Sequence, residues 1–145
     1  MTVNFIETPG KTEPEITISA DRLTPELEEL IGKLSGIDLS PLTAYNGESA
    51  VLLERREIIR FFTDGKGVSV ESEAGTFSIK KRLYELEAIL GKSFVRISNS
   101  EIINVRHITA IDLSISGTVK LTLTGGRVSY SSRRYIKKLK EAVGL

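Results

Sequence analysis

FVRISNSEIIN, residues 94–104, is the stretch that decides the fold of this chain. Two apolar runs, FVRI and IIN, enclose a polar Ser-Asn-Ser triplet at 98–100. β-Branched and aromatic residues favour strands, whereas Ser and Asn favour tight turns because their side chains bond nearby backbone. We therefore expect two strands joined by a turn that presents Ser98 and Asn99.

A second informative stretch, SSRRYIKKLK, occupies residues 131–140. Here a β pattern gives way to a basic helix, which Ser132 is expected to cap. Arg133 and Arg134 follow the strand and open the helix, where an arginine fork grips phosphate or reads guanine N7 and O6. A pair of solvated surface arginines is the alternative.

The rest of the chain after residue 40 is also predicted to be mainly β with short helices. Asp-Gly-Lys-Gly at 64–67 predicts a hairpin turn with Gly65 and Lys66 at its tip. Leucines at helical spacing predict a helix over about 79–90 that stops at Gly91. Strands are expected at 50–53, 57–63, 68–71, 76–79, 105–113, 119–123 and 127–130.

The N-terminal residues predict a small strand-strand-helix piece. Weak alternation at 2–7 and apolar residues on one face at 15–20 favour two strands. Thr24-Pro25 marks a helix start, with Thr24 as the N-cap, and Ser35-Gly36 marks the helix end. Leu27, Leu30, Ile31 and Leu34 give this helix one apolar face.

Charge is distributed unevenly on the two sides of a Pro-containing link at 37–42. Residues 1–40 hold three basic residues against eight acids, and residues 41–145 hold seventeen against eleven. We expect a small acidic α/β region at 1–40, for dimerisation or partner docking, and a basic domain at 41–145 suited to a polyanion. The alternative is a solvated acidic helix beside an ordinary basic surface.

Composition excludes several classes of protein. The 145 residues include no Cys and a single His, so disulfides, thiolate metal sites and multi-His metal sites are excluded. No apolar run approaches the ~18 residues that span a membrane, and the N-terminus lacks a secretion signal. We expect a cytoplasmic protein.

No enzyme signature is present in the sequence. The Gly-Lys-Gly triplet at 65–67 is too short for a phosphate-binding loop, and one His gives no credible catalytic triad. Adjacent acids such as Glu28-Glu29 are expected on an exposed helix face. We therefore expect no catalytic residue, cofactor, metal or small-molecule substrate.

A nucleic-acid partner fits the residues better. From residue 76 onward there are thirteen Lys and Arg against five acids, and cations bind nucleic acid by neutralising phosphates. The amide of Asn99 can pair bidentately with adenine or simply cap a turn. Lys66 can contact DNA, or it can simply keep the hairpin turn soluble. An RNA-binding domain is less favoured, because no strand carries the paired aromatics that stack on single-stranded bases.

Residues 45–143 resemble the LytTR family of bacterial DNA-binding domains. The resemblance rests on an ordered set of segments: EIIRFF, a Gly/Lys hairpin, RLYELEAIL, FVRISNSEIIN, SGTVKLTL, GGRVSY and SRRYIKKL. It implies an elongated sandwich of three small β-sheets that inserts loops into successive major grooves, often with bending. It also implies three reading elements: the loop at 65–68, the turn with Asn99, and Arg134 with Arg133 nearby. We expect DNA contacts from Gly65, Lys66, Ser98, Asn99, Arg133, Arg134, Lys137 and Lys138.

One position departs from the family pattern. Val68 stands where a family member presents a His or another long polar group, and it cannot donate a hydrogen bond. Lys66 is then expected to substitute, or a thymine methyl is contacted. Asn104 matches a strand end of the family, and we interpret it as structural.

The resemblance also bears on regulation. Forty-odd residues cannot build a receiver domain of about 120 residues, so phosphorylation is not the expected switch. The layout resembles that of regulators controlled by abundance or by a small membrane-protein inhibitor encoded nearby. We expect a sequence-specific transcription regulator that acts as a homodimer on paired repeats in double-stranded DNA. The alternative is a protein-interaction module whose acidic N-terminal region holds a membrane-protein partner, with DNA binding incidental.

Overall fold

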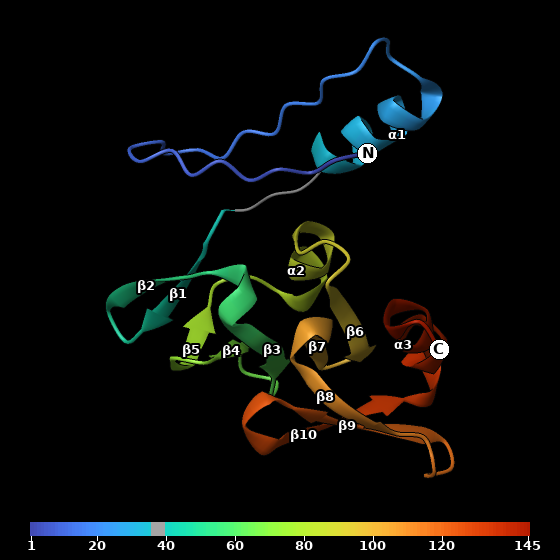
Figure 1. Ribbon diagram of the computed structural model, residues 1–145. Coiled ribbons are helices and arrows are strands. Elements are labelled where there is room, and N and C mark those ends of the chain that lie inside the picture. Colours follow the sequence, from blue (N-terminus) through green and yellow to red (C-terminus); the bar gives the residue numbers. More distant parts are fainter. Residues whose placement is uncertain (36–39) are drawn as a thin grey trace. The chain divides into compact units, whose positions relative to one another are not determined.

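The computed structural model describes residues 1–35 and 40–145 and divides the chain into two compact units, Met1–Gly36 and Ile37–Leu145 (Figure 1). The first unit contains helix α1, Pro25–Ser35. Thr24 Oγ1 accepts a hydrogen bond from the Leu27 backbone N–H at 3.3 Å, which confirms the predicted N-cap. The expected helix end at Gly36 and the expected link over 37–39 lie outside the described residues.

The strands predicted at 2–7 and 15–20 are not formed, and that part of the prediction was wrong. Both segments run without a strand partner to receive their backbone hydrogen bonds. Alternation in a sequence shows which face a strand would bury, but a strand forms only when a neighbour completes the ladder. Most of their apolar side chains lie exposed, with Phe5 at 90% and Ile16 at 70%.

The second unit is mainly β with short helices, which confirms the predicted fold class. Its strands are β1 Leu42–Asn46, β2 Ser49–Leu53, β3 Ile58–Thr63, β4 Val68–Ser72, β5 Gly75–Ile79, β6 Phe94–Ser98, β7 Glu101–Asn104, β8 Ile108–Asp112, β9 Thr118–Leu123 and β10 Arg127–Ser132. Its helices are α2 Leu83–Ile89 and α3 Ile136–Val143, with 3₁₀ turns η1 Arg55–Glu57, η2 Val105–His107, η3 Thr124–Gly126 and η4 Arg133–Tyr135.

Hydrogen bonds connect the strands into two antiparallel sheets, where the resemblance implied three. The larger sheet has the order β2-β1-β5-β4-β3-β7-β6, and the smaller has the order β10-β9-β8. The single register pair Tyr45↔Ser78 joins β1 to β5, and Arg60 to Phe62 of β3 pair with β7. These short ladders merge segments that would otherwise count as separate sheets.

Strands β3, β6 and β7 form a central layer that is buried on both faces. Phe94 and Ile102 pack with Phe61 into one core, which α2 covers through Leu83 and Leu86, with Leu90 at the C-cap of the helix. Val95, Ile97 and Ile103 pack into a second core with β9 and with Leu139 of α3. Figure 1 shows α2 and α3 on these different sides. The run FVRISNSEIIN has little alternation because its strands have no solvent face.

Several elements of the second unit differ from the prediction. The strand predicted at 105–113 begins only at Ile108, because residues 105–107 form η2. Helix α2 begins at Leu83 and not near 79, because Ile79 still pairs with Val68 as the last residue of β5. Strand β1 was not predicted at all, since its residues Leu-Thr-Ala-Tyr-Asn carry a weak pattern. Ser132 does not cap a helix: its hydroxyl donates to the Ile97 carbonyl at 3.5 Å, and a 3₁₀ turn precedes α3.

Candidate nucleic-acid interface

The turn between β6 and β7 carries Asn99, as predicted, and an arginine holds it from behind. The Arg96 guanidinium donates to the carbonyl oxygens of Ser98 at 3.0 Å and Asn99 at 2.6 Å. The Ser98 hydroxyl accepts the Ser100 backbone N–H at 3.2 Å. Asn99 and Ser100 are exposed, so the turn presents its tip to solvent while its backbone is held by side chains.

The hairpin turn between β3 and β4 lies next to this turn. The Thr63 backbone N–H donates to the Ser100 carbonyl at 3.0 Å, and Phe62 pairs with Glu101. Residues 64–67 therefore project from the same end of the sheet as residues 98–100. Gly65 adopts φ +94°, a conformation that suits Gly, and Lys66 is exposed at the tip. Val68 is half-buried in the ladder.

The 3₁₀ turn η4 places Tyr135, and with it Arg134, beside the turn that carries Asn99. Tyr135 donates its hydroxyl proton to Asn99 Oδ1 at 3.0 Å. The Arg134 guanidinium carbon lies 5.6 Å from the centre of the Tyr135 ring. Arg133 is directed differently, since its guanidinium lies over Gly117, where an added Cβ would meet Nη2 at 3.0 Å. Three segments far apart in sequence thus lie near one another.

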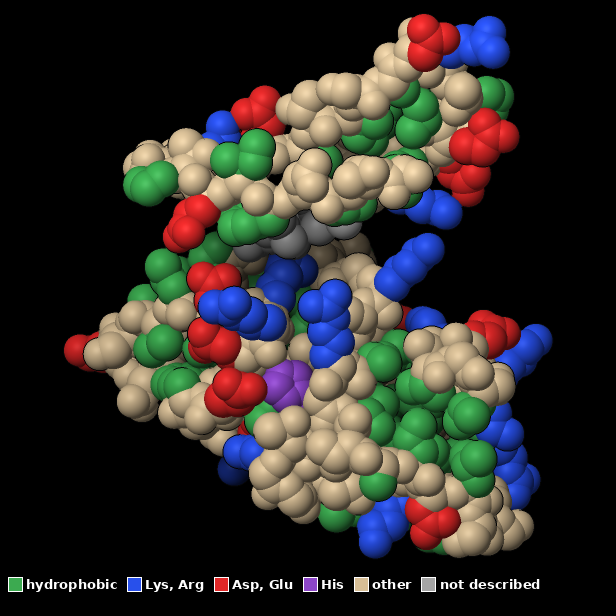
Figure 2. All heavy atoms as spheres, viewed as in Figure 1, with side chains coloured by type: hydrophobic (Ala, Val, Ile, Leu, Met, Phe, Trp, Pro, Cys, Tyr) green, Lys and Arg blue, Asp and Glu red, His purple; other side chains and the backbone are tan. Residues whose placement is uncertain are grey.

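The lysines of α3 extend this basic surface. Lys137 and Lys138 are exposed, and Lys and Arg side chains gather along the edge of the molecule beside α3 (Figure 2). Lys138 Nζ lies 3.0 Å from Glu87 Oε1, and Arg96 Nη1 lies 3.1 Å from Glu87 Oε2. The hydrogen bond from Lys138, helped by Arg96, lowers the pKa of Glu87 below its usual value. Glu87 therefore neutralises part of the positive charge that Lys138 adds to this surface.

Sequence reasoning missed Arg96 and Tyr135 as parts of this surface. By residue type, Tyr135 fits an apolar position beside the basic helix, and Arg96 is one of the thirteen cations from residue 76 onward. The signal for Tyr135 was its place directly after an arginine pair. Arg96 stands two residues before the Ser-Asn-Ser triplet, which is the reach of a guanidinium to a turn backbone.

A cluster of charged groups lies behind the turn and ties the two sheets together. Arg60 binds Glu71 at 2.8 Å and donates to the Ser129 hydroxyl at 2.7 Å, and Arg127 binds Glu71 at 2.9 Å. Glu101, the first residue after the turn, lies 3.7 Å from Arg60 and keeps Oε2 buried without a hydrogen bond in the described structure. Burial raises the pKa of Glu101, while the Ser129 hydroxyl and Arg60 oppose the rise.

Asn104 and His107 act in the framework at the opposite ends of these strands. Asn104 is buried, donating to the Ile58 carbonyl at 2.8 Å and accepting the Arg106 N–H at 3.1 Å. The two ring nitrogens of His107 lie 2.9 Å from Thr124 Oγ1 and 2.7 Å from the Arg56 carbonyl oxygen. The structural interpretation of Asn104 is confirmed by these contacts.

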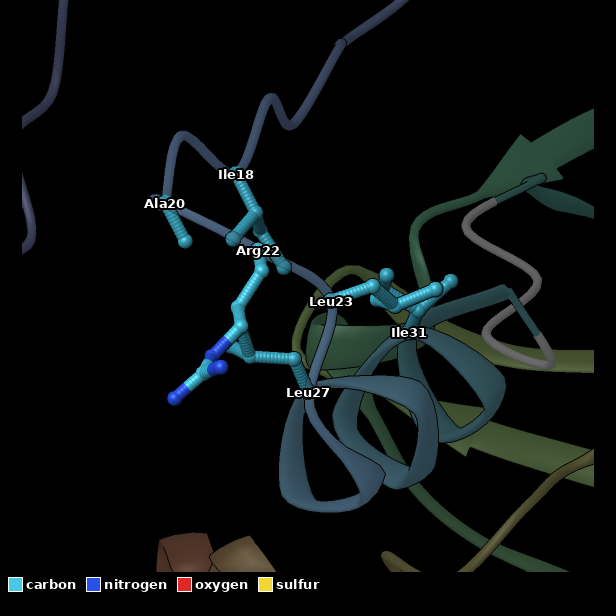
Figure 3. A pocket seen from close by; sticks show the side chains of 6 residues that line it. All are labelled: Ile18, Ala20, Arg22, Leu23, Leu27 and Ile31. Carbon is cyan, nitrogen blue, oxygen red and sulfur yellow. The ribbon is translucent and has the colours of Figure 1, made fainter.

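A separate apolar groove lies within the N-terminal unit, between the segment at 18–23 and α1 (Figure 3). Its apolar lining consists of Ile18, Ala20, Leu23, Leu27 and Ile31. None of the side chains in residues 1–35 is buried. This unit therefore keeps its apolar side chains open to a further contact.

Metal binding and membrane insertion find no support in the described parts of the chain. Over residues 1–35 and 40–145, no group of three or more His, Cys, Asp or Glu side chains is arranged to hold a metal ion. The helices described there are too short and too polar to cross a membrane.

Comparison with known proteins identifies the family. A model of the LytTr DNA-binding domain matches residues 48–144. The chain belongs to the LytTR family. A solved LytTr DNA-binding domain from Bacillus cereus superposes with a TM-score of 0.70 at 26% identity, covering 73% of this chain and 98% of that one. The LytTR family is a family of DNA-binding transcription regulators and not a class of enzymes.

Relatives extend the likeness to the N-terminal unit. An uncharacterized HTH-type transcriptional regulator of Staphylococcus aureus strain NCTC 8325 / PS 47 is 32% identical over 146 residues, covering 100% of this chain and 99% of the relative. A protein of the same description from strain MRSA252 is 31% identical over the same span. In the LytTR unit described here, strands β6–β10 separate α2 from α3, so these two helices do not form a helix-turn-helix.

Proposed function

We propose that this LytTR protein is a transcription regulator that reads paired short repeats in promoter DNA with loop residues in the major groove. The observation that carries the proposal is the convergence of three exposed segments, 64–67, 98–100 and 133–135, at one end of the central layer. Loops that project together from a rigid sheet can enter a groove without a recognition helix.

Each segment supplies a different chemical group. Asn99 offers an amide that pairs with adenine, and Arg134 offers a guanidinium that pairs with guanine. Lys66 offers an ammonium at the hairpin tip, and Gly65 lets the backbone turn sharply there. In this proposal Asn99, Arg134 and Lys66 contact base edges, and Arg133 binds phosphate beside them.

The remaining members of the proposed site support these contacts. Ser98 shapes the turn through its bond to Ser100 and lies close enough to its tip to meet the DNA backbone. Lys137 and Lys138 bind phosphates, which adds affinity without sequence information. Glu87 competes with phosphate for Lys138, so Lys137 contributes more to binding than Lys138 does.

The N-terminal unit completes the proposal as a self-association element. Its apolar residues have no cover within residues 1–35, and a second copy supplies a matching apolar surface. Two copies then place two basic surfaces on half-sites about one helical turn apart, or a small multiple of it. The exposed groove also favours the second candidate, in which residues 1–40 hold a small membrane-protein inhibitor.

DNA binding of this kind takes place in the cytoplasm and needs no phosphodonor, metal or small molecule. The test is selection of fragments from the source genome by the purified full chain, followed by footprinting of the selected fragments. We expect one short sequence, repeated at helical spacing. Equal recovery of all fragments would show that the basic surface binds DNA without reading it.

A further inference from the structure

We propose that Tyr135 is a positioning residue that joins two of the reading elements into one unit. Its hydroxyl fixes the amide of Asn99, and its ring supports the guanidinium of Arg134. This inference rests on the proposed function, because it assigns a role in the reading of bases. It concerns a side chain that makes no assigned base contact of its own.

The hydroxyl contacts the oxygen end of the Asn99 amide. An asparagine amide has an acceptor oxygen and a donor nitrogen, and rotation about its last bond exchanges the two. A hydroxyl that donates to Oδ1 at 3.0 Å holds the oxygen toward η4 and leaves the NH₂ group free to donate. One lone pair of Oδ1 also stays free, so the amide can still pair with adenine through N7 and N6.

The backbone of the same residue is held independently. Arg96 binds the Asn99 carbonyl at 2.6 Å and the Ser98 carbonyl at 3.0 Å. With the backbone held by Arg96 and the side-chain oxygen held by Tyr135, Asn99 reaches the groove in one orientation. A side chain ordered before binding loses less conformational entropy when it binds.

The ring of Tyr135 acts on the other reading element. The Arg134 guanidinium carbon lies 5.6 Å from the ring centre, within the range of cation–π attraction. A free arginine side chain samples many rotamers, and contact with a ring face reduces that freedom. Tyr135 is the residue directly after Arg134, so the contact forms locally within η4.

Two substitutions separate the two contacts. Tyr135→Phe removes the hydroxyl and keeps the ring, whereas Tyr135→Leu removes both. We expect Tyr135→Phe to weaken discrimination at the base pair read by Asn99 by about three- to tenfold, the range for one neutral hydrogen bond. Discrimination at the base pair read by Arg134 should not change. Tyr135→Leu should weaken discrimination at both base pairs.

The experiment measures competition binding of the full chain on a panel of fragments from the selected site, each with one base pair changed. Tyr130→Phe is the matched control, because Tyr130 is 53% exposed on β10, outside the three reading segments. Thermal unfolding and affinity for random DNA are measured for every variant. Both should stay at the wild-type level for Tyr135→Phe, since a positioning role affects only the reading of bases.

The double variant Asn99→Ala/Tyr135→Phe decides whether the two residues act together. We expect it to bind no more weakly than Asn99→Ala alone, since the hydroxyl acts through the amide. Independent losses that multiply, or a wild-type discrimination profile for Tyr135→Phe, would overturn the inference. If the wild-type protein itself shows no preference among the fragments, the proposed function fails, and that result is distinct from a failure of the Tyr135 assignment.

Discussion

At the scale of single residues, the proposed function assigns base recognition to Arg134 and Asn99. Both side chains are exposed, so removal of either one leaves the buried scaffold in place. Arg134→Ala and Asn99→Ala should each weaken specific binding by about 1–3 kcal/mol, the range for one good base contact. Competition titrations on the folded variants measure this.

Lys137→Ala provides the contrast to these variants. Phosphate contacts carry no sequence information, so this change should weaken binding to specific and random DNA almost equally. A loss confined to the specific fragment would place Lys137 at a base edge. Unchanged specific affinity in Arg134→Ala would show that the third reading element is placed wrongly.

Asn104 and Asn99 show how one residue type serves two purposes in a single stretch. Asn104→Ala leaves the Ile58 carbonyl and the Arg106 N–H without their partner inside the protein. We expect a loss of about 1–3 kcal/mol in the free energy of unfolding, measured by urea denaturation. Asn99→Ala is the matched control, because Asn99 is exposed. Equal stability of the two variants would contradict the structural role of Asn104.

The contributions of Glu101 and Glu87 to the free energy of unfolding should change in opposite directions as the pH rises. Burial raises the pKa of Glu101, so ionisation costs stability in the folded protein as the pH rises above the ordinary value of 4.5. The Lys138 hydrogen bond lowers the pKa of Glu87, so its contribution is present above 4.5 and is lost as the pH falls through the lowered value.

Two variants test these signs by denaturation between about pH 3 and pH 7, a window set by the shifts around the glutamate reference value. Glu101→Gln should gain stability relative to the wild type as the pH rises. Glu87→Gln should lose stability relative to the wild type over the same rise. Parallel curves for both variants and the wild type would show that neither carboxyl is perturbed by folding.

At the scale of elements, most strands of the LytTR unit could be predicted from the sequence, whereas β1 was missed and the strands predicted at 2–7 and 15–20 do not form. Runs such as EIIRFF and VKLTL form strands because neighbouring runs of the same chain complete their ladders. Residues 2–7 have a similar pattern without such a neighbour. Alternation of apolar residues therefore shows that a segment can form a strand. Whether it does so depends on a neighbouring strand that its tertiary contacts supply.

The candidate site was predictable in part, for a related reason. Asn99 and Arg134 lie at turns and element ends that the sequence marks with polar residues. Tyr135 and Arg96 act through contacts whose partners are fixed only when β6, β7 and η4 meet. The pairing of Lys138 with Glu87 spans 51 residues in the sequence and could not be inferred from spacing.

The two compact units suggest a direct test at this scale. Deletion of residues 1–40 should leave a folded LytTR unit, because both of its cores are built from residues after 41. We expect the truncated protein to sediment as a monomer and to bind DNA more weakly than the full chain. An unfolded truncation would show that the two regions share one core, and an unchanged oligomeric state would remove self-association from the N-terminal unit.

At the scale of the whole molecule, the charge distribution and the converging loops make predictions about the DNA. Affinity should fall steeply with salt, since each neutralised phosphate releases counterions. The site should bend, because two copies that insert their loops into successive grooves gain contacts when the duplex curves toward them. Circular-permutation gel assays measure the bend. A straight site, or affinity independent of salt, would contradict a surface that grips phosphates.

The central claim is that the converging loops read a DNA sequence, and one titration tests it most directly. The purified full chain is titrated onto its selected fragment and onto a shuffled fragment, in a gel-mobility assay with and without acetyl phosphate. We predict two successive complexes on the selected fragment, at least about a thousandfold tighter than on the shuffled one, and unchanged by acetyl phosphate. Equal affinity for both fragments, or an absolute requirement for the phosphodonor, would contradict the account.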